Sequence, residues 1–317
     1  MKKTILVIGA NGQLGTVLTQ SLQLKYGKEN IVASDLRPRE NYDGIFEILD
    51  ATDVRALEKV VLKYHIGEIY HLAAILSANG EKDPLHTWGV NMKALLNVLE
   101  VSRHNGMDKV FFPSTIAVFG EGASQENTCN NEPLHPLTSY GISKVAGENW
   151  GLYYFSKYGL DVRSLRYPGV IGYQSNAGGG TTDYAVEIFH SAVLEKPFTC
   201  FLDGKTTLPM IFIDDAIRAT LELMDAPKES IKVRTSYNIS GISFSPEEVV
   251  SSIRKIYPNF EVNYVPDHRQ DIASKWPKTI NDKEAKQDWG WRPEYDMEKI
   301  TNVMVYKLKE RYNVVSK

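Results

Sequence analysis

The segment that most constrains the fold is a short apolar run followed at once by regularly spaced glycines. Residues 4–8 read Thr-Ile-Leu-Val-Ile, and Gly9, Gly12 and Gly15 follow in the spacing G-x-x-G-x-x-G. Apolar residues then recur at helical spacing as far as Leu22. Glycine permits a tight turn and a close backbone approach to a pyrophosphate, and the N-terminus of a helix offers N–H groups to phosphates. The pattern therefore predicts a strand–turn–helix unit that binds a dinucleotide.

Short apolar runs alternate with helical patterns along most of the 317-residue chain. Strands buried on both faces of a parallel sheet have this almost purely apolar character. The strands are expected at residues 4–8, 31–34, 45–49, 68–71, 109–112, 162–167 and 236–240, and the helices at 53–64, 90–103, 139–158 and 214–224. We therefore predict an α/β fold with a Rossmann-type, doubly wound parallel sheet.

The pattern changes after about residue 172, where a glycine-rich stretch opens an insertion. From Gly241 onward the chain becomes richer in proline, tryptophan and charge. We expect an NAD-binding domain of residues 1–172 and 209–240. A smaller, discontinuous substrate domain is expected to comprise residues 173–208 and 241–317.

Composition excludes several classes of protein. There are 36 basic and 39 acidic residues, so the formal net charge is −3, and no basic excess favours nucleic acid or an anionic membrane. No apolar run approaches the ~20 residues of a membrane span. The two cysteines, Cys129 and Cys200, and the seven histidines lack metal-ligand spacing, so no metal is expected. We expect a cytoplasmic protein, and a mitochondrial address on a longer precursor stays open.

The end of the second expected strand carries the residue that would choose the cofactor. Asp35 lies twenty residues after Gly15, where a carboxylate accepts a hydrogen bond from a ribose 2′-hydroxyl and repels a 2′-phosphate. Arg37 lies two residues further on and would suit a phosphate. With Asp35 in the ribose position, the sequence favours NAD over NADP.

Two further strand ends fit the rest of a dinucleotide. Asp50, between Leu49 and Ala51, can accept from an adenine amino group, and the small residues Ala73 and Ala74 would let the cofactor backbone pass. His71 ends the strand expected at residues 68–71, just before these alanines, and we interpret it as a core histidine rather than a catalytic one.

A tyrosine and a lysine form the candidate reaction centre. Tyr140 and Lys144 are four residues apart, so they share one face of a helix. A phenol of pKa ~10 is a poor base at neutral pH, but an adjacent ammonium and the charge of an oxidised nicotinamide favour the phenolate. The fifth expected strand runs into Ser114 and Thr115, whose hydroxyls can hold a substrate oxygen. The sequence does not decide which hydroxyl is the principal one.

These motifs resemble those of the extended short-chain dehydrogenase/reductase superfamily, in its NAD-dependent epimerase/dehydratase group, over roughly residues 1–240. The resemblance is carried by the segments 9–15, 71–74, 114–120 and 139–144. The segments 166–171 and 178–186, with Ser77, are similar to a narrower family, the short-chain-type L-threonine 3-dehydrogenases. That family resemblance implies NAD-dependent oxidation of L-threonine at its Cβ hydroxyl to 2-amino-3-oxobutanoate. The superfamily resemblance also implies a homodimer formed through helices near 90–103 and 139–158.

The resemblance and the residues together give a full set of expected contacts. The catalytic residues are Tyr140, Lys144, Ser114 and Thr115. The residues expected to contact NAD are Gly9, Asn11, Gly12, Gln13, Leu14, Gly15, Asp35, Leu36, Arg37, Leu49, Asp50, Ala51, Leu72, Ala73, Ala74, Tyr140, Lys144, Tyr167, Pro168 and Ile171. The residues expected to contact substrate are Ser77, Ser114, Thr115, Tyr140, Gly179, Gly180, Thr181, Thr182 and Trp276.

The glycine–threonine string has a physical reading that fits an amino-acid carboxylate. Three glycines, 178 to 180, expose backbone N–H groups, and the hydroxyls of Thr181 and Thr182 follow at an expected helix start. Trp276 is expected either to close over a small substrate or to pack in the core.

Two other functions stay open. The first is a nucleotide-sugar epimerase or dehydratase, which would share the sheet and the Tyr–Lys pair. Such epimerases carry Arg-Asp where this chain has Leu208, Pro209 and Met210, which argues against it. The second is a non-catalytic NAD-binding regulator, a class in which the tyrosine or lysine can be lost; both are present here.

Overall fold

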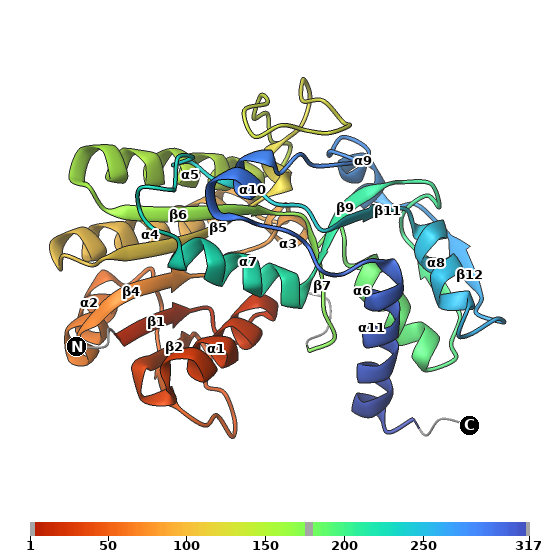
Figure 1. Cartoon of the computed structure of the whole chain (residues 1–317), viewed down its shortest axis with the longest axis horizontal. Coiled ribbons are helices and arrows are strands. Elements are labelled where there is room, and N and C mark those ends of the chain that lie inside the picture. The colour runs from red at the N-terminus through yellow and green to blue at the C-terminus, as the bar shows by residue number, and fades with distance from the viewer. Residues whose placement is uncertain (1–3, 175–179, 315–317) are drawn as a thin grey trace.

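A seven-stranded sheet forms the centre of the molecule in the computed structural model, which describes residues 4–174 and 180–314 (Figure 1). Its strand order is β3-β2-β1-β4-β5-β6-β10, and every neighbouring pair is parallel. The strands are β1 (Thr4–Ile8), β2 (Ile31–Asp35), β3 (Ile45–Ile48), β4 (Ile66–His71), β5 (Lys109–Thr115), β6 (Asp161–Tyr167) and β10 (Tyr237–Asn238). The predicted doubly wound α/β fold is confirmed.

The strand order places a crevice at the carboxyl end of β1. The chain proceeds outward from β1 to β2 and β3 on one side, then returns to β4 on the other side of β1. Ligands of doubly wound sheets bind where the order reverses in this way. The carboxyl ends of β1, β2, β4 and β5 therefore meet at one site.

Helices cover both faces of this sheet (Figure 1). On one face α4 (Pro84–His104) packs against α2 (Val54–Tyr64) and α5 (Ser139–Tyr158), and on the other α1 (Gln13–Tyr26) packs against α7 (Ile213–Asp225). Side chains at the N-caps of three of these helices accept hydrogen bonds from backbone N–H groups, which fixes where the helices begin. These capping residues are Asp53, Asp83 and Thr138.

The remaining elements gather beyond the carboxyl edge of the large sheet (Figure 1). A second sheet has the order β11-β9-β7, and a third pairs β12 with β8. Their strands are β7 (Gly169–Ile171), β8 (Phe198–Cys200), β9 (Leu208–Phe212), β11 (Ile242–Phe244) and β12 (Val262–Tyr264). The helices here are α6 (Tyr184–Val193), α8 (Pro246–Arg254), α9 (His268–Ala273) and α11 (Met297–Tyr312). The helix α10 (Lys283–Trp289) packs against β10 of the large sheet, and short helices elsewhere are α3 (Ser77–Gly80), η1 (Lys28–Asn30) and η2 (Ile116–Val118).

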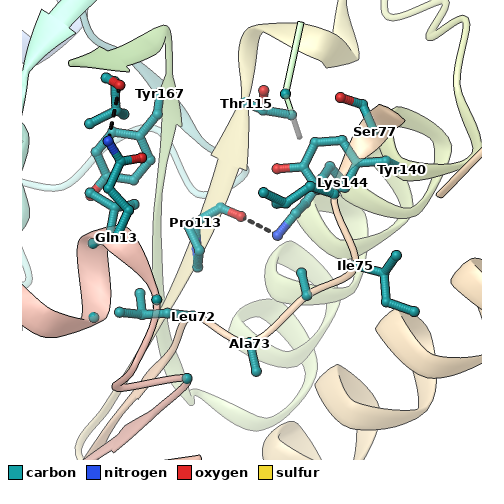
Figure 2. A pocket seen from close by; sticks show the side chains of 18 of the residues that line it. Gln13, Leu72, Ala73, Ile75, Ser77, Pro113, Thr115, Tyr140, Lys144 and Tyr167 are labelled. Atoms are coloured by element: carbon teal, nitrogen blue, oxygen red, sulfur yellow. Dashed lines mark hydrogen bonds between the residues drawn. The ribbon is translucent and has the colours of Figure 1, made fainter. Parts of the chain in front are cut away.

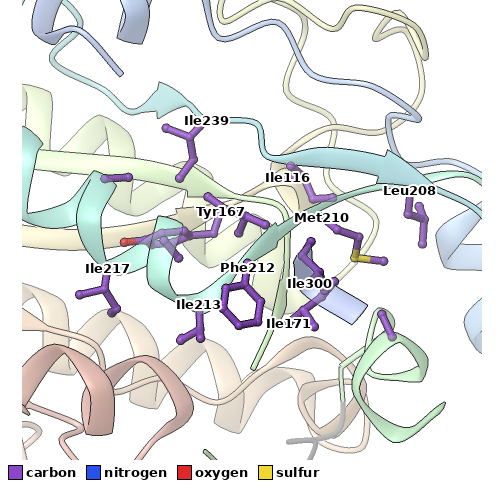
Figure 3. Packing of buried hydrophobic residues seen from close by; sticks show 14 of the residues in the cluster. Ile116, Tyr167, Ile171, Leu208, Met210, Phe212, Ile213, Ile217, Ile239 and Ile300 are labelled. Carbon is purple, nitrogen blue, oxygen red and sulfur yellow. The ribbon is translucent and has the colours of Figure 1, made fainter. Parts of the chain in front are cut away.

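One buried apolar cluster runs from the large sheet into this second group of elements. Tyr167 of β6, Ile171 of β7 and Phe212 of β9 are 5% exposed or less and pack in one cluster with Ile300 of α11 (Figure 3). Burial of such side chains is worth about 1.5–3 kcal/mol each. The division into two discontinuous domains stays a prediction. The continuous core joins the large sheet to the second group of elements.

Two segments far apart in sequence run side by side near the site. The Thr128 amide donates to the Thr279 carbonyl at 3.0 Å, and the Asn281 amide donates back to the Thr128 carbonyl at 3.0 Å. The Lys278 amide donates to the carbonyl of Gln125 at 2.7 Å. These bonds hold residues 278–281, which directly follow the turn that carries Trp276, to residues 125–128. We call this arrangement the 125–128/278–281 clip.

The differences from the sequence prediction have local causes. β5 extends to Thr115 rather than ending at residue 112, because Ser114 and Thr115 pair with Arg166 and Tyr167 of β6. The helix predicted to start at residue 90 begins at Pro84, where Asp83 caps it and proline suits the first turn. Within residues 4–174 and 180–314, no helix is long and apolar enough to cross a membrane.

Candidate functional site

A cavity of about 460 Å³ opens at the carboxyl ends of the central strands, where the fold predicts a ligand crevice. It runs from Asp35 and Asp50, at the ends of β2 and β3, past the glycine loop to Tyr140 on α5. Residues 180–183 and Trp276 line the cavity as well, so the second group of elements contributes to its wall. Figure 2 shows the Tyr140 side chain near Thr115, and Lys144 from the same helix extending toward the carbonyl of Pro113.

The glycine loop leaves space that any side chain would fill. Gly9 has a φ of +86°, and a Cβ there would lie 2.7 Å from the Ala73 nitrogen. A Cβ on Gly15 would lie 2.1 Å from the Gly9 carbonyl oxygen. No side chain caps the N-terminus of α1 at Gly12. This loop and helix end fit the phosphates of a dinucleotide.

Asp35 is a carboxylate at the cofactor end of the cavity. Its carboxylate accepts from the Asn11 amide at 3.0 Å and from the Leu36 amide at 2.8 Å, which fixes its orientation. Arg37 is exposed and is not part of the lining; its carbonyl accepts from the Asn11 side chain at 2.9 Å. A carboxylate without a facing arginine fits a ribose diol better than a 2′-phosphate.

Lys144 is buried beneath the cavity floor. Its Nζ donates to the Pro113 carbonyl at 2.7 Å and lies 4.3 Å from the Phe112 ring centroid and 5.5 Å from the Tyr140 ring centroid. Burial lowers the pKa of Lys144 to about 7, and the charge of Glu148 opposes that shift. Lys144 therefore loses its proton more readily than an exposed lysine does.

Tyr140 has the opposite shift. Burial raises the pKa of Tyr140 to about 12, and a hydrogen bond with the Thr115 hydroxyl partly opposes this. The sequence argument expects the adjacent ammonium to favour the phenolate. In the protein by itself burial is the main influence on the pKa of Tyr140, and the lysine amine donates to the carbonyl of Pro113.

Ser114 and Thr115 have different partners, which separates two hydroxyls that the sequence leaves equivalent. The Ser114 hydroxyl donates to Glu148 Oε1 at 2.5 Å, inside a buried ion pair between Glu148 and Arg166. The Thr115 hydroxyl accepts from the Ala117 amide at 3.2 Å and contacts Tyr140. Thr115 is therefore the hydroxyl beside the phenol.

The glycine–threonine string meets the same cavity. Thr181 is 1% exposed, and its hydroxyl has no hydrogen-bond partner among the described residues; the same holds for the indole N–H of Trp276. Ser77, at the start of α3, lines the cavity with Gly180 and Thr182. Gly179 lies outside the described residues. As expected, α6 begins just after the string, at Tyr184.

Most predicted site residues line the cavity, and a few do not. Asn11, Arg37 and Ile171 are outside the lining; Asn11 lies behind Asp35, and Ile171 is fully buried in the core. His71 is also buried outside the lining, as expected, with its ring stacked on Phe112. Its Nδ1 has no hydrogen-bond partner among the described residues, and burial lowers its pKa to about 3.

The sequence analysis missed several lining residues. Most are apolar or backbone contacts that no motif distinguishes: Ile8, Ile75, Leu76, Val90, Ala94, Pro113, Ile116, Gly169 and Val170, together with Thr52. The exception is Asp183, whose carboxylate accepts from the Gly180 amide at 2.7 Å. Its position directly after Thr181 and Thr182 was the available signal.

Comparison with known proteins decides the family. Residues 5–240 match the model of the NAD dependent epimerase/dehydratase family. The chain belongs to this family. It is therefore an NAD-dependent enzyme, and the resemblance stated from its motifs is confirmed. An uncharacterised epimerase/dehydratase of Staphylococcus aureus is 40% identical to this family member, with 98% of each chain covered.

Solved structures of the same family give a narrower likeness. An L-threonine dehydrogenase from Cupriavidus necator is 47% identical, with a TM-score of 0.95 over 96% of this chain and 100% of that one. An L-threonine dehydrogenase from Clostridium difficile is 40% identical, with a TM-score of 0.95 over 98% of each chain.

Proposed function

We propose that this enzyme oxidises the Cβ hydroxyl of L-threonine with NAD, giving 2-amino-3-oxobutanoate, NADH and a proton. The observation that carries the proposal is the composition of the substrate end of the cavity. Hydroxyl groups and one carboxylate gather there, and Lys144 is the only lysine or arginine among the described lining residues. A small zwitterion needs no more charge than this, whereas a second diphosphate beside that of NAD would call for a further set of donors or cations.

The hydroxyls are placed to receive the substrate carboxylate. Thr181 is buried with an unpartnered hydroxyl, and Ser77 and Thr182 line the same wall. A buried polar group without a partner costs about 1–3 kcal/mol, which a bound carboxylate would relieve. Asp183, on the same wall, supplies the opposite charge for the substrate ammonium. Trp276 closes this end of the cavity.

The reacting hydroxyl is placed between Thr115 and Tyr140. Thr115 orients the substrate oxygen, and Tyr140 as phenolate takes its proton while the Cβ hydrogen leaves as hydride. Bound NAD supplies the hydride acceptor. Lys144 provides positive charge beside the phenolate and, by resemblance to the superfamily, reaches the nicotinamide ribose. Positioning and electrostatics are the main contributions of the chain's own residues.

The competing proposal is that the enzyme is a nucleotide-sugar epimerase. Its Arg-Asp position corresponds here to Leu208 and Pro209, which are buried in β9 and absent from the lining. The non-catalytic reading is disfavoured because Tyr140, Thr115 and Lys144 converge on one cavity.

Titration of the NAD-bound protein separates these readings. We expect L-threonine to bind and to produce NADH absorbance, and UDP-galactose to leave the calorimetric signal flat. L-serine should turn over far more slowly, because the site should also receive the threonine methyl group. Binding of UDP-galactose without binding of threonine would replace the dehydrogenase proposal with the epimerase one.

The assembly expected by resemblance is also part of this proposal. Trp150, Tyr153 and Tyr158 of α5 are 38–45% exposed and contact one another, or the buried Tyr154 between them, through their rings. Exposed apolar patches of this kind mark association surfaces. We expect a homodimer in the cytoplasm, which solution mass and fractionation would test.

A further inference from the structure

A buried ion pair lies directly behind the Tyr140–Lys144 pair, and the proposed reaction does not use it. Glu148 follows Tyr140 and Lys144 at the next helical spacing, so all three share one face of α5. The Glu148 side chain is 0% exposed, and that of its partner Arg166 on β6 is 2% exposed. Two of the three guanidinium nitrogens meet the carboxylate, with Nε at 2.9 Å from Oε1 and Nη2 at 2.7 Å from Oε2.

The other partners of this pair fix its position from several elements. Ser114 at the end of β5 donates to the same Glu148 Oε1 at 2.5 Å. The third guanidinium nitrogen of Arg166 donates to the Asn130 carbonyl at 2.7 Å and to Asn238 Oδ1 at 3.3 Å. The Glu148 carboxylate therefore cannot reorient without breaking several buried hydrogen bonds.

The charges around Lys144 give this carboxylate a role. Tyr140 and Glu148 face Lys144 from α5, and His71 faces it from β4. The Phe112 ring and the Pro113 carbonyl of β5 contact it and carry no charge, and Arg166 on β6 reaches the group through Glu148. His71 is neutral because its pKa is far below 7. With Lys144 charged, the cluster carries one net positive charge, which a Tyr140 phenolate would balance. Without Glu148 it would carry two.

We propose that Glu148 is a positioning residue for the Tyr140–Lys144 pair: held by Arg166 and Ser114, its carboxylate compensates the buried Lys144 ammonium and locks the end of β5 against α5. The lock commits Ser114 to Glu148 and leaves Thr115 facing the phenol. This inference rests on the proposed function only for its expected effect on kcat. The expected effect on the protonation of Lys144 does not depend on which substrate the enzyme oxidises.

The test follows the protonation of Lys144 in the cofactor-free protein by NMR. With lysine labelled with ¹⁵N at Nζ, the Lys144 signal is the one missing from the Lys144→Met variant. We expect Glu148→Gln, which keeps the shape and removes the charge, to lower the titration midpoint of Lys144 by about one pH unit or more. Glu148→Asp keeps the charge and should leave the midpoint close to that of the unmodified protein.

The same strand offers a matched control. Arg163, at the other end of β6, forms an equally buried ion pair with Asp161, with side chains 0% and 4% exposed. Asp161→Asn removes a carboxylate from that pair and should destabilise the protein without moving the Lys144 midpoint. A purely structural role for Glu148 predicts the same pattern for Glu148→Gln, so an unchanged midpoint there would overturn the proposal.

A double variant and a turnover measurement complete the test. Should Glu148→Gln fail to fold, the double variant Glu148→Gln/Arg166→Gln replaces the ion pair with neutral amides and leaves no guanidinium buried without its carboxylate. The Lys144 midpoint should still fall there, because the charge that supports the Lys144 ammonium is that of Glu148. An unchanged midpoint would count against the proposal. In turnover with L-threonine, Glu148→Gln should reduce kcat about tenfold or more with a smaller change in KM. If no variant or parent oxidises threonine while the midpoint still falls, the proposed function fails and the role of Glu148 stands.

Discussion

The phenol of Tyr140 is the residue on which the proposed chemistry depends most directly. Tyr140→Phe keeps the ring in place and removes the oxygen that is proposed to accept the substrate proton. We expect NAD to bind as before and turnover to fall by about 10²-fold or more. Stopped-flow or steady-state NADH absorbance measures the turnover, and a parallel titration measures the NAD affinity. Near-normal turnover would remove Tyr140 from the mechanism.

The pH dependence of the same step follows from the raised pKa of Tyr140. A base works only when deprotonated, and burial keeps this phenol protonated at neutral pH. Raising the pH increases the fraction of phenolate, so turnover should rise from pH 7 to pH 9, and the residual rate of Tyr140→Phe should lack that rise.

Asp35 should set the preference between the two nicotinamide dinucleotides. Asp35→Ser removes the charge that repels a 2′-phosphate and weakens the bond to the ribose, so the ratio of kcat/KM for NAD over NADP should drop by about tenfold or more. Arg37→Ser is the matched control, because Arg37 is exposed and outside the lining. It should leave the ratio nearly unchanged. Equal use of NAD and NADP by the unmodified protein would contradict the assignment.

Residue-level prediction from sequence works where a motif fixes the backbone and fails where side chains choose partners. Gly9, Asp35 and Tyr140 follow from spacing alone, and the structure places all three on the cavity. The choice between Ser114 and Thr115 depends on Glu148, which lies 34 residues from Ser114 in the chain. No local pattern contains that information.

At the scale of elements, the closest approach in the site is between the start of α1 and the loop before it. Gly15→Ala would force a Cβ to 2.1 Å from the Gly9 carbonyl oxygen, so the helix must shift away from the phosphate site. We expect a lower melting temperature and a loss of NAD affinity of about tenfold or more. Differential scanning fluorimetry with and without NAD measures both.

The control for that prediction is a glycine of α4 with open space around it. A Cβ on Gly89 would meet nothing within 4 Å, and alanine favours a helix by about 1 kcal/mol over glycine. Gly89→Ala should therefore raise the melting temperature slightly and leave NAD affinity alone. If Gly15→Ala behaves in the same way, the close packing of α1 is not what shapes the cofactor site.

Elements of the parallel sheet are predictable because burial on both faces makes their strands almost entirely apolar. The small strands β7, β8, β9, β11 and β12 have three to five residues, too few for an apolar pattern to be diagnostic, and their pairing comes from chain segments far apart. The pairing of β9 with both β7 and β11 can be predicted only if one knows how the second group of elements folds back onto the sheet. That arrangement is a property of the tertiary structure.

For the molecule as a whole, the substrate end of the cavity is the part that unites the two groups of elements. Thr181→Ala and Thr182→Ala should each raise the KM for L-threonine by about tenfold or more, because each removes a hydroxyl from a buried carboxylate site. NAD affinity should change little. Thr52→Ala, at the adenine end of the same cavity, is the matched control and should not affect the KM for threonine. Equal effects of all three variants would place the carboxylate elsewhere.

The 125–128/278–281 clip has a consequence for the order in which the site is assembled. Its hydrogen bonds join residues about 150 positions apart, and loop closure over such a separation is slow compared with local pairing. The first six strands of the large sheet are synthesised by residue 167, well before residue 278 leaves the ribosome. A growing chain thus acquires its dinucleotide crevice early and receives Trp276 late. Under the proposed function, the substrate end of the site is therefore completed after the dinucleotide crevice.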